Sequence, residues 1–367
     1  MRSSWLVAFA LASVLAATAT AMLRRLSLVV GFVDEPGPSK RHSRPIPYLG
    51  GVAIAGATLA GWLFEPQLST RIAALALAGV AVALIGLLDD HRRIGPLARL
   101  TAEAAAAAGV VAAGVRAEPT NMAPVNIAIT IVWIVGVTNA LNLLDNMDGL
   151  AAGTAAAASA GVFALAAIEG QDMLATVAIS LCGACVGFLV HNWRPASIFM
   201  GDAGALFIGF VLSVAVLELV PDVPSPVSLV VPALLLALPV LDTTVVSVAR
   251  LRRGRSLVTG GQDHLSHRLE KLGLSPSVAV AILVVVEVLM ATLAVLCGSA
   301  VLPVWVTVIL AVTVLGALAM VATRAGVYPE SPAVPTVRPW RRAVATPPRH
   351  ARQYASAPHD AYDAAES

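Results

Sequence analysis

Apolar residues gather in about eleven long segments along the chain, and short polar loops separate them. Each segment approaches the ~20 residues that a helix needs to cross a bilayer, although some are shorter. The segments are 4–23, 47–64, 72–88, 99–115, 125–141, 150–168, 173–190, 203–220, 227–249, 277–297 and 301–323. Apolar residues do not alternate with polar ones, as they do in the strands of a membrane β-barrel. The pattern predicts an all-α polytopic membrane protein with about 11 transmembrane helices.

Composition supports the same class, because hydrophobic residues make up 58%, charged residues only 13%, and the mean hydropathy is +0.82. An ordinary soluble domain is far more polar. Cys182, Cys185 and Cys297 all lie in apolar segments. The first two have C-x-x-C spacing, but without a second pair or a nearby His we interpret them as packing residues. No nucleic-acid partner is expected.

Basic residues fall on alternate loops, and of the 24 Lys and Arg only Arg2, Arg71 and Arg116 are exceptions. The positive-inside rule therefore predicts an outer N-terminus, a cytoplasmic C-terminus and a multi-pass protein of the inner (plasma) membrane. The first segment resembles a signal peptide, but the basic loop that follows it favours a retained span. We expect one transmembrane domain over 1–324 and a disordered cytoplasmic tail over 325–367, rich in Pro, Ala and Arg.

The stretch 139–149, Asn-Ala-Leu-Asn-Leu-Leu-Asp-Asn-Met-Asp-Gly, carries Asp145 and Asp148 at i and i+3. In a helix both would lie on one face. Carboxylates at the end of a membrane helix are costly and usually mark a functional site. The alternative is a solvated loop, in which Asn and Asp only turn the chain. Other acids recur at the same predicted face, and this favours a site.

Two of those acids, Asp89 and Asp90, are neighbours at a predicted helix end, where a negative charge opposes the helix dipole. Because neighbours on a helix point ~100° apart, we expect them to play different parts, one at a metal or proton and one orienting a partner. A third acid, Asp202, lies between glycines that allow close approach of a ligand, and it could also cap a helix. The pair Gly50-Gly51 predicts close packing where the second segment begins.

Cationic residues occupy the first and last of the predicted cytoplasmic loops. Lys40 and His42 lie in the first, where they suit phosphate or anionic lipid. The last loop starts inside a segment at Asp242 and holds Arg250, Arg252, Arg253, Arg255, Asp263, His264, His267 and Arg268. Arginines and histidines in one loop suit a polyphosphate. Histidines at i, i+3 can ligate zinc, but the acids elsewhere are hard oxygen donors that favour Mg²⁺ or Mn²⁺.

Carboxylates, a hard divalent metal and cationic side chains on one face indicate phosphoryl-type transfer, in which charge must be neutralised while the reacting groups are held in line. A site at the membrane surface suggests one lipid substrate and one water-soluble substrate. Glu287 stands alone in the middle of the tenth segment, and without a visible partner it is left out of the predicted site.

The motifs, taken in chain order, resemble those of the polyprenyl-phosphate N-acetylhexosamine-1-phosphate transferases. This family includes the undecaprenyl- and decaprenyl-phosphate GlcNAc-1-phosphate transferases and the phospho-MurNAc-pentapeptide translocases. The motifs are Asp34 to Gly51 with Lys40 and His42, Asp89-Asp90, Asn139 to Gly149, Phe199 to Gly204, and Asp263 to Arg268. The resemblance implies transfer of a sugar-1-phosphate from a UDP-sugar to polyprenyl phosphate, with release of UMP and a need for Mg²⁺.

The resemblance and the residues together give the candidate site. The candidate catalytic residues are Asp89, Asp90, Asp145, Asp148 and Asp202, of which Asp89, Asp145 and Asp202 are the candidate metal ligands. The candidate substrate-binding residues are Lys40, His42, Asn142, Asn192, Arg252, Arg253, Asp263, His264, His267 and Arg268.

Two departures from the family pattern bear on the substrate. Ala205 follows the Gly-Asp-Ala-Gly motif where many members have Ser, and 264–268 is His-Leu-Ser-His-Arg without consecutive histidines. The second departure favours GlcNAc-1-phosphate or another HexNAc-1-phosphate over phospho-MurNAc-pentapeptide. An ion-coupled transporter or flippase ranks lower, because its acids would lie near the membrane midplane in related halves, and no halves repeat. A non-catalytic scaffold would leave the loop motifs unexplained, and whether the chain forms a homodimer stays open.

Overall fold

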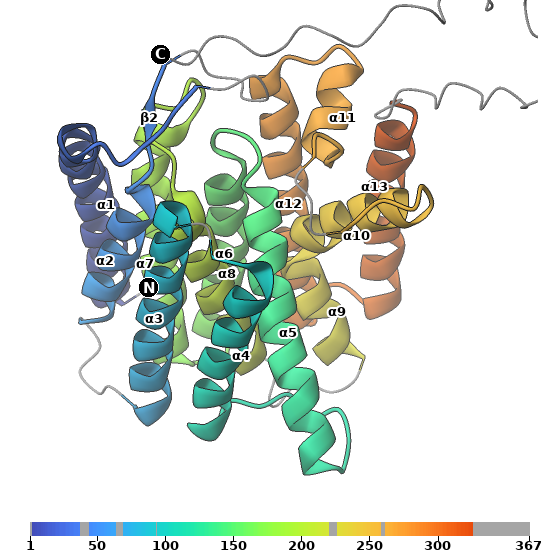
Figure 1. Cartoon of the computed structure of the whole chain (residues 1–367). Helices are drawn as coiled ribbons and strands as arrows, with labels where there is room; N and C mark the ends of the chain where they lie inside the picture. The colour runs from blue at the N-terminus through green and yellow to red at the C-terminus, as the bar shows by residue number, and fades with distance from the viewer. Residues whose placement is uncertain are drawn as a thin grey trace, which may run out of the picture. The chain divides into compact units, whose positions relative to one another are not determined.

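The computed structural model describes residues 2–36, 44–63, 69–92, 94–219, 226–257 and 261–325, and these form helices with one short hairpin (Figure 1). The elements are α1 (Ser3–Val30), β1 (Val33–Asp34), β2 (Ile46–Pro47), α2 (Gly50–Trp62), α3 (Thr70–Arg92), α4 (Pro96–Ala112), α5 (Ala123–Leu144), α6 (Leu150–Ile168), α7 (Asp172–Asn192), α8 (Gly201–Glu218), α9 (Val227–Leu235), α10 (Ala237–Leu251), α11 (Leu265–Lys271), α12 (Pro276–Gly298) and α13 (Val304–Thr323). The prediction of an all-α protein is confirmed.

Eight helices in the described part of the chain are long and apolar enough to cross a membrane, namely α1, α3, α5, α6, α7, α8, α12 and α13. Each of the segments expected from the sequence contains a helix, but α2 spans only 13 residues and α4 only 17. The structure therefore defines a multi-pass membrane protein, while the count of about eleven spans and the inside–outside orientation stay predictions.

The predicted segment 227–249 is helical but is not one continuous helix. The segment is divided into α9 and α10, which meet at Leu236 and are bent by 77° to each other. As a result α10 lies across the direction of the neighbouring helices (Figure 1). Pro232 inside α9 and Pro239 near the start of α10 lack the N–H that a continuous helix needs, and this explains the break.

The centre of the bundle is built from α6, α7 and α8, whose side chains are the most completely buried of the candidate spans. Small residues bring the neighbouring helices close to α8. A Cβ on Gly51 of α2 would lie 2.1 Å from the backbone N of Gly204, and one on Gly86 of α3 would lie 2.5 Å from the carbonyl O of Asp202. The predicted close packing at Gly51 is thus confirmed, and it fixes α2 and α3 against the N-terminus of α8.

The β1–β2 hairpin crosses the end of the bundle at which α3 and α5 finish and α8 begins (Figure 1). Its register is antiparallel, with Val33 opposite Pro47 and Asp34 opposite Ile46. Lys40 and His42, which the sequence analysis placed in the site, fall between the two strands and lie outside the described residues. Nearly all of the predicted tail, 325–367, lies outside them as well.

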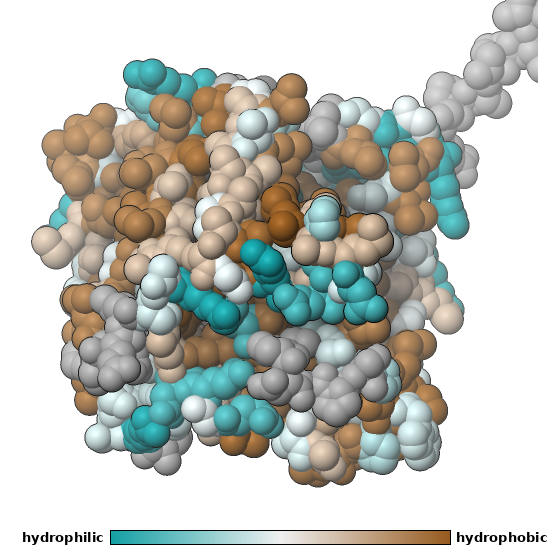
Figure 2. All heavy atoms as spheres, turned by 90° about the horizontal axis from the view of Figure 1, so that it is seen from below, coloured by the Kyte–Doolittle hydropathy of each residue, from teal (hydrophilic) through white to brown (hydrophobic). Residues whose placement is uncertain are grey.

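Figure 2 shows the opposite end of the bundle, where hydrophilic side chains form a broken band across an apolar surround. Two pairs of opposite charges lie at this end among the described residues. Arg71 at the start of α3 and Glu218 at the end of α8 approach to 3.2 Å, and Arg2 pairs with Asp172. Such exposed pairs contribute little stability, and they leave no excess of one charge at these positions. The end with the hairpin is different, because several of its carboxylates face one another.

Candidate functional site

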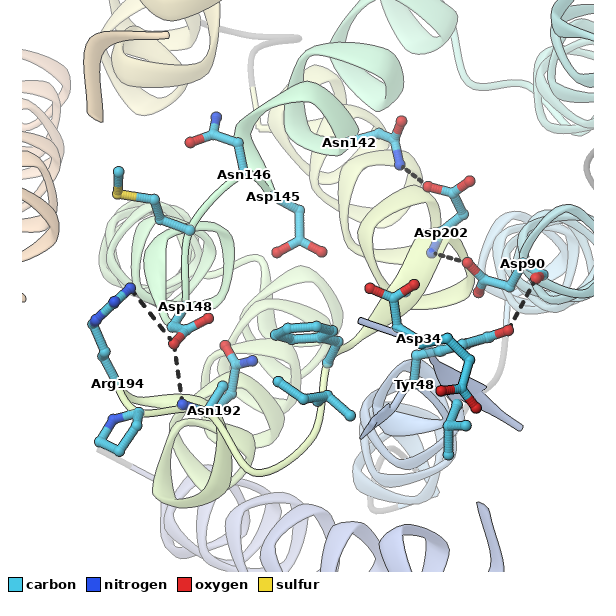
Figure 3. Close-up of a pocket in the computed structure, with 18 of the residues that line it drawn as sticks. Asp34, Tyr48, Asp90, Asn142, Asp145, Asn146, Asp148, Asn192, Arg194 and Asp202 are labelled. Atoms are coloured by element: carbon cyan, nitrogen blue, oxygen red, sulfur yellow. Dashed lines mark hydrogen bonds and ion pairs between the residues drawn. The ribbon is translucent and has the colours of Figure 1, made fainter. Parts of the chain in front are cut away.

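A cavity of ≈ 980 Å³ opens at the hairpin end of the bundle (Figure 3). Many of the residues singled out from the sequence line it, although they come from helices far apart in the chain. The lining includes Asp89, Asp90, Asn142, Asp145, Asp148, Asn192, Asp202 and His267. The acids therefore lie at helix ends around one chamber, and not near the middle of the spans.

Helix ends create this concentration of acid. Asp89 and Asp90 lie in the last turn of α3, Asp145 follows α5, and Asp202 lies in the first turn of α8. Gly149, with φ +80°, turns the chain from the Asp145–Asp148 loop into α6. A residue with a Cβ is strained in that conformation, and this accounts for the glycine that ends the motif.

Both side-chain oxygens of Asp90 accept hydrogen bonds from the start of α8. Its Oδ1 accepts a hydrogen bond from the backbone N of Asp202 at 2.9 Å, and its Oδ2 accepts one from the N of Ala203 at 3.3 Å. A carboxylate at these positions caps α8 and is favoured by the helix dipole. The Asp90 carbonyl also accepts from the Tyr48 hydroxyl at 3.2 Å, which ties the hairpin to α3.

Asp89 points to a different partner, as expected for the neighbouring position on a helix. Arg99 Nη1 of α4 lies 3.3 Å from Asp89 Oδ2 and 3.6 Å from Asp202 Oδ2, so one guanidinium lies between two carboxylates. In the sequence, Arg99 is only one of the basic residues that predict a cytoplasmic loop. Its proximity to the acids depends on how α4 packs against α3, which spacing along the chain does not reveal.

Arg99 is held in turn by two polar residues that the sequence analysis also missed as site residues. Its Nε lies 3.5 Å from Oε1 of Glu103, a fully buried acid one turn along α4, and its Nη2 donates to Oδ1 of Asn139 at 3.2 Å. Asn139 Nδ2 also donates to Glu103 Oε2 at 2.5 Å. The i, i+4 spacing of Arg99 and Glu103 was a signal that could have found this pair.

Asp202 is bound on its other side by Asn142, whose Nδ2 donates to Asp202 Oδ1 at 2.6 Å. The amide of α5 and the guanidinium of α4 thus hold the two oxygens of one carboxylate. This fixes the Asp202 side chain at the wall of the cavity (Figure 3). Fixed carboxylates are what a cation or phosphoryl site requires, because they need no reorganisation when the charged ligand arrives.

Asp145 is the exception among these acids, because no described residue donates a hydrogen bond to its carboxylate. It points into the cavity between the other acids (Figure 3). Its pKa is raised to about 8, first by burial and then by the nearby charges of Asp202, Asp90 and Asp148. A carboxyl in this position lacks a cation, and a divalent metal ion would supply one.

The donor set fits a magnesium ion only in part. Within the described residues, no three His, Cys, Asp or Glu side chains converge closely enough to hold a metal by themselves. Mg²⁺ in phosphoryl-transfer sites is usually held by one or two carboxylates and by oxygens of the substrate phosphates. Asp145, which no described residue engages, suits that arrangement, and Asp202 lies beside it. Arg99 contacts both Asp202 and Asp89, but only its shorter contact of 3.3 Å with Asp89 is a hydrogen bond.

The loop residues on the other side of the cavity have mainly structural contacts. Asn192 is 2% exposed, and it accepts from Gly149 N and donates to Ile198 O, both at 2.9 Å. Asp148 accepts from Ala196 N at 3.1 Å and lies 3.9 Å from Arg194. Both residues line the cavity, but Asn192 holds two loops together and has little surface left for a substrate.

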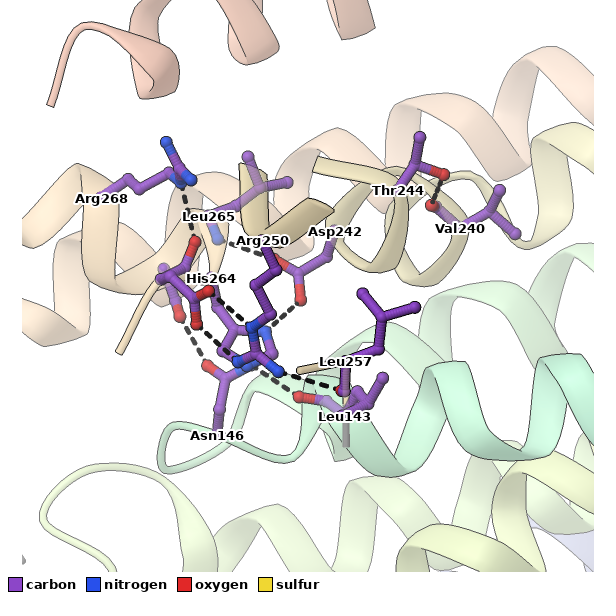
Figure 4. A network of polar contacts seen from close by, with 12 residues as sticks. Leu143, Asn146, Val240, Asp242, Thr244, Arg250, Leu257, His264, Leu265 and Arg268 are labelled. Carbon is purple, nitrogen blue, oxygen red and sulfur yellow. Dashed lines mark hydrogen bonds and ion pairs between the residues drawn. The ribbon is translucent and has the colours of Figure 1, made fainter. Parts of the chain in front are cut away.

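The segment 261–268, which carries His264 and His267 and is called the histidine loop below, is held by side chains of α10 (Figure 4). Asp242 Oδ2 contacts His264 Nδ1 at 2.7 Å, and Asp242 Oδ1 accepts from Leu265 N at 2.6 Å. Arg250 binds both carboxylate oxygens of Asp263 at 2.7 and 2.8 Å. The Asp263 and His264 side chains are therefore bound to α10, and neither lines the cavity.

The remaining cationic residues of that loop divide between cavity, interior and surface. His267 lines the cavity. Arg268 is buried, and its Nε donates to the carbonyl O of Asp263 at 2.7 Å. Arg252 and Arg253 are exposed where α10 ends, and neither is among the residues that line the cavity. The structure thus gives no support to the expectation that these two arginines contact a ligand in this cavity.

The fold is that of a multi-pass membrane protein in which carboxylates gather around a cavity at one end of the helices. Residues 72–220 match the model of glycosyl transferase family 4. The chain is 32% identical over 314 residues to a decaprenyl-phosphate N-acetylglucosaminephosphotransferase of Mycolicibacterium smegmatis, covering 74% of this chain and 77% of the relative. The chain therefore belongs to the polyprenyl-phosphate sugar-1-phosphate transferases of glycosyl transferase family 4, and it is a sugar-phosphate transferase.

Two further relatives agree. The chain is 28% identical over 304 residues to a probable undecaprenyl-phosphate N-acetylglucosaminyl 1-phosphate transferase of Bacillus subtilis, covering 80% of this chain and 85% of the relative. It is 28% identical over 303 residues to an undecaprenyl-phosphate alpha-N-acetylglucosaminyl 1-phosphate transferase of Escherichia coli, covering 78% and 82%. The family that the sequence motifs predict is confirmed.

Proposed function

We propose that the enzyme transfers a HexNAc-1-phosphate, in the first place GlcNAc-1-phosphate, from a UDP-sugar to polyprenyl phosphate and releases UMP. The observation that carries the proposal is the convergence of Asp89, Asp145, Asp148 and Asp202 on one cavity at the end of membrane-length helices. A lipid phosphate can enter such a site from the bilayer and a sugar nucleotide from water. The relatives are named as transferases that join N-acetylglucosaminyl phosphate to undecaprenyl or decaprenyl phosphate, which supports the lipid acceptor and the sugar, while the UDP-sugar donor is part of our proposal.

In this reaction, an oxygen of the lipid phosphate forms a bond to the β-phosphorus of the UDP-sugar. The bond from that phosphorus to the oxygen bridging it to the α-phosphate breaks, and UMP leaves with that oxygen. No proton is consumed overall when the acceptor phosphate is already a dianion. Catalysis then depends on holding the two phosphates in line and balancing their charge.

Asp145 and Asp202 are the residues that would hold Mg²⁺ together with the diphosphate of the donor. The ion, when bound, would neutralise the developing charge on the diphosphate oxygens. Asn142 keeps the Asp202 carboxylate oriented through the bond of 2.6 Å, and Asp145 is available because no described residue engages it. Mn²⁺ shares the preference for oxygen ligands and is expected to substitute.

Asp89 is the residue we assign to the acceptor phosphate. Asp90 cannot easily serve, because both its oxygens accept backbone N–H groups of α8. Asp89 has one charged partner, Arg99, and lines the cavity. It would accept a proton from a monoanionic lipid phosphate, and Arg99 would keep the charge of Asp89 from repelling that phosphate.

Release of UMP by the purified protein tests the proposal. The protein is given polyprenyl phosphate and Mg²⁺, and UDP-GlcNAc and UDP-MurNAc-pentapeptide are offered in separate reactions. We expect lipid-dependent UMP release with UDP-GlcNAc, little with UDP-MurNAc-pentapeptide, and loss of the reaction with EDTA. Release with UDP-MurNAc-pentapeptide alone would instead identify the pentapeptide transferase, and release with EDTA present would remove the metal from the proposal.

A further inference from the structure

The break between α9 and α10 leaves backbone groups without helical partners in the interior of the bundle. At the start of α10, the first N–H groups have no carbonyl one turn earlier to which they can donate. Leu238 N donates instead to the side chain of Glu287, with 2.9 Å between the N and Oε2. The next residue, Pro239, has no N–H, so Leu238 is the last donor that this end of α10 needs to satisfy.

Glu287 reaches this N–H from the middle of α12, where it is fully buried. Its other oxygen, Oε1, has no hydrogen-bond partner in the described part of the chain. An acidic side chain inside a membrane helix is costly, so its presence calls for a compensating role. The bond to Leu238 is the contact that Glu287 makes with α10, and it holds the helix where the span bends by 77°.

From that point α10 connects directly to the cavity. Asp242 lies one helical turn after Leu238 and holds the start of α11 through Leu265 N at 2.6 Å and His264 at 2.7 Å. The Ser266 hydroxyl then donates to Oδ1 of Asn146 at 2.5 Å, and Asn146 lies in the loop between Asp145 and Asp148 (Figure 4). His267, the next residue, lines the cavity.

We propose that Glu287 is a positioning residue of the enzyme: it fixes the N-terminus of α10 and, through Asp242, the place of His267 and the Asn146 loop at the cavity. The role requires a hydrogen-bond acceptor at the right distance and does not require a charge. This inference rests on the proposed function only in the experiments that measure activity.

Two substitutions of Glu287 test whether its role requires a hydrogen-bond acceptor at the right distance or a negative charge. Glu287→Gln keeps the side-chain length and an oxygen that accepts from Leu238 N. Glu287→Asp keeps the acid but shortens the side chain by one methylene, so its oxygens no longer reach. We expect kcat of Glu287→Gln within about two-fold of the parent and kcat of Glu287→Asp lower by about ten-fold, since a misplaced catalytic group costs this much or more. Thr292→Val, an exposed position of the same helix, is the matched control.

Hydrogen exchange of the purified protein gives a readout that does not depend on the reaction. Peptides covering 237–251 and 261–271 should exchange faster in Glu287→Asp, and at the parental rate in Glu287→Gln and Thr292→Val. Faster exchange of these peptides supports the proposal even if none of the sugar nucleotides is turned over. Parental exchange in Glu287→Asp would overturn it.

The two variants also test the obvious rival, a role for the charge. If Glu287→Asp keeps parental kcat and Glu287→Gln loses it, Glu287 acts as an ionisable group and the proposal is wrong. A double-mutant cycle with Asp242→Asn completes the test. Both residues act through α10, so the double variant Glu287→Asp, Asp242→Asn should have a kcat only slightly below that of the less active of the two single variants. Additive losses would show two independent effects and would contradict the proposed connection.

Discussion

At the scale of single residues, neighbouring acids of the cavity differ in what binds them. Asp90 accepts two backbone N–H groups, Asp202 is held by Asn142 and Arg99, and Asp145 has no donor among the described residues. From these differences we expect Asp145 to bind a ligand and Asp90 to stabilise the fold. They also predict different responses to the same Asp→Asn change.

The raised pKa of Asp145, about 8 against an ordinary value of 3.8, predicts a pH-dependent stability. The folded state keeps the proton between those values and the unfolded state loses it, so this group lowers stability as pH rises toward 8. Asp145→Asn removes the effect. We expect its Tm, relative to the parent, to rise from pH 5 to pH 8 in thermal unfolding without metal, while UMP release is lost.

The contradictory result for Asp145 is a Tm difference that stays constant over this pH range. Addition of Mg²⁺ at pH 8 provides the control, because the ion should raise the Tm of the parent and have a smaller effect on Asp145→Asn.

The contrast between Asp89 and Asp90 gives a second prediction. Asp89→Asn should lower kcat by at least about a hundred-fold with little change in Tm, because its side chain is proposed to act on the acceptor phosphate. Asp90→Asn should lower Tm as well, because the amide keeps one acceptor oxygen but sets its NH2 against the second of the two backbone N–H groups that the carboxylate accepts. Turnover and thermal unfolding of both variants check this. Equal Tm values for the two variants would contradict the capping role of Asp90.

At the scale of helices, the close approach of α2 and α3 to the start of α8 gives the cavity its shape. The contact depends on the absence of a side chain at Gly51, where a Cβ would lie 2.1 Å from Gly204 N. No rotamer change can relieve a clash with backbone, so the helices would have to separate. The cavity acids at the ends of α3 and α8 would then move apart with them.

Gly51→Ala should therefore reduce both Tm and UMP release, or prevent folding. Gly56→Ala is the matched control in the same helix, because a Cβ there meets nothing within 4 Å. It should keep activity and gain up to about 1 kcal/mol of stability from the better helix former. Detergent-purified yield, Tm and turnover distinguish the two. Parental behaviour of Gly51→Ala would contradict the close packing.

The elements were largely predictable from sequence because a long apolar segment has few alternatives to a membrane helix. The break at Leu236 was not predicted, because the spans were assigned from hydropathy, which does not depend on whether a residue has a backbone N–H. Pro232 and Pro239 lack that N–H and could have indicated the break. The acids of the cavity were predictable from their place at helix ends. Their individual partners were not, because Arg99 of α4 meets Asp89, Asp202 and Asn139 only through the packing of separate helices.

At the scale of the whole molecule, the two ends of the bundle differ in charge arrangement. One end has acids facing a cavity, and the other has exposed pairs such as Arg71–Glu218. Arg252 and Arg253, which follow α10, neither line the cavity nor belong to these exposed pairs. Counting charges in a loop could not tell Arg252 from His267, because the direction of a side chain depends on how α10 and α11 pack.

Substitution of these residues should separate surface from cavity. Arg252→Gln and Arg253→Gln should leave kcat and the KM for the sugar nucleotide within about two-fold of the parent, because neither side chain lines the cavity. His267→Ala, by contrast, should lower kcat/KM by about ten-fold or more through loss of a cavity contact. Steady-state kinetics compares them. A rise in KM for Arg252→Gln as large as that for His267→Ala would place the arginine at the substrate.

The first measurement to make follows the β-phosphate of the donor. UDP-GlcNAc labelled with ³²P at the β-position is incubated with the enzyme, polyprenyl phosphate and Mg²⁺, and the lipid and water phases are separated. Transfer of the sugar-1-phosphate moves the label into the lipid phase and leaves unlabelled UMP in the water, whereas Asp145→Asn moves none. Label that stays in the water phase as UDP, while the sugar enters the lipid, would contradict phosphoryl transfer at the carboxylate cavity.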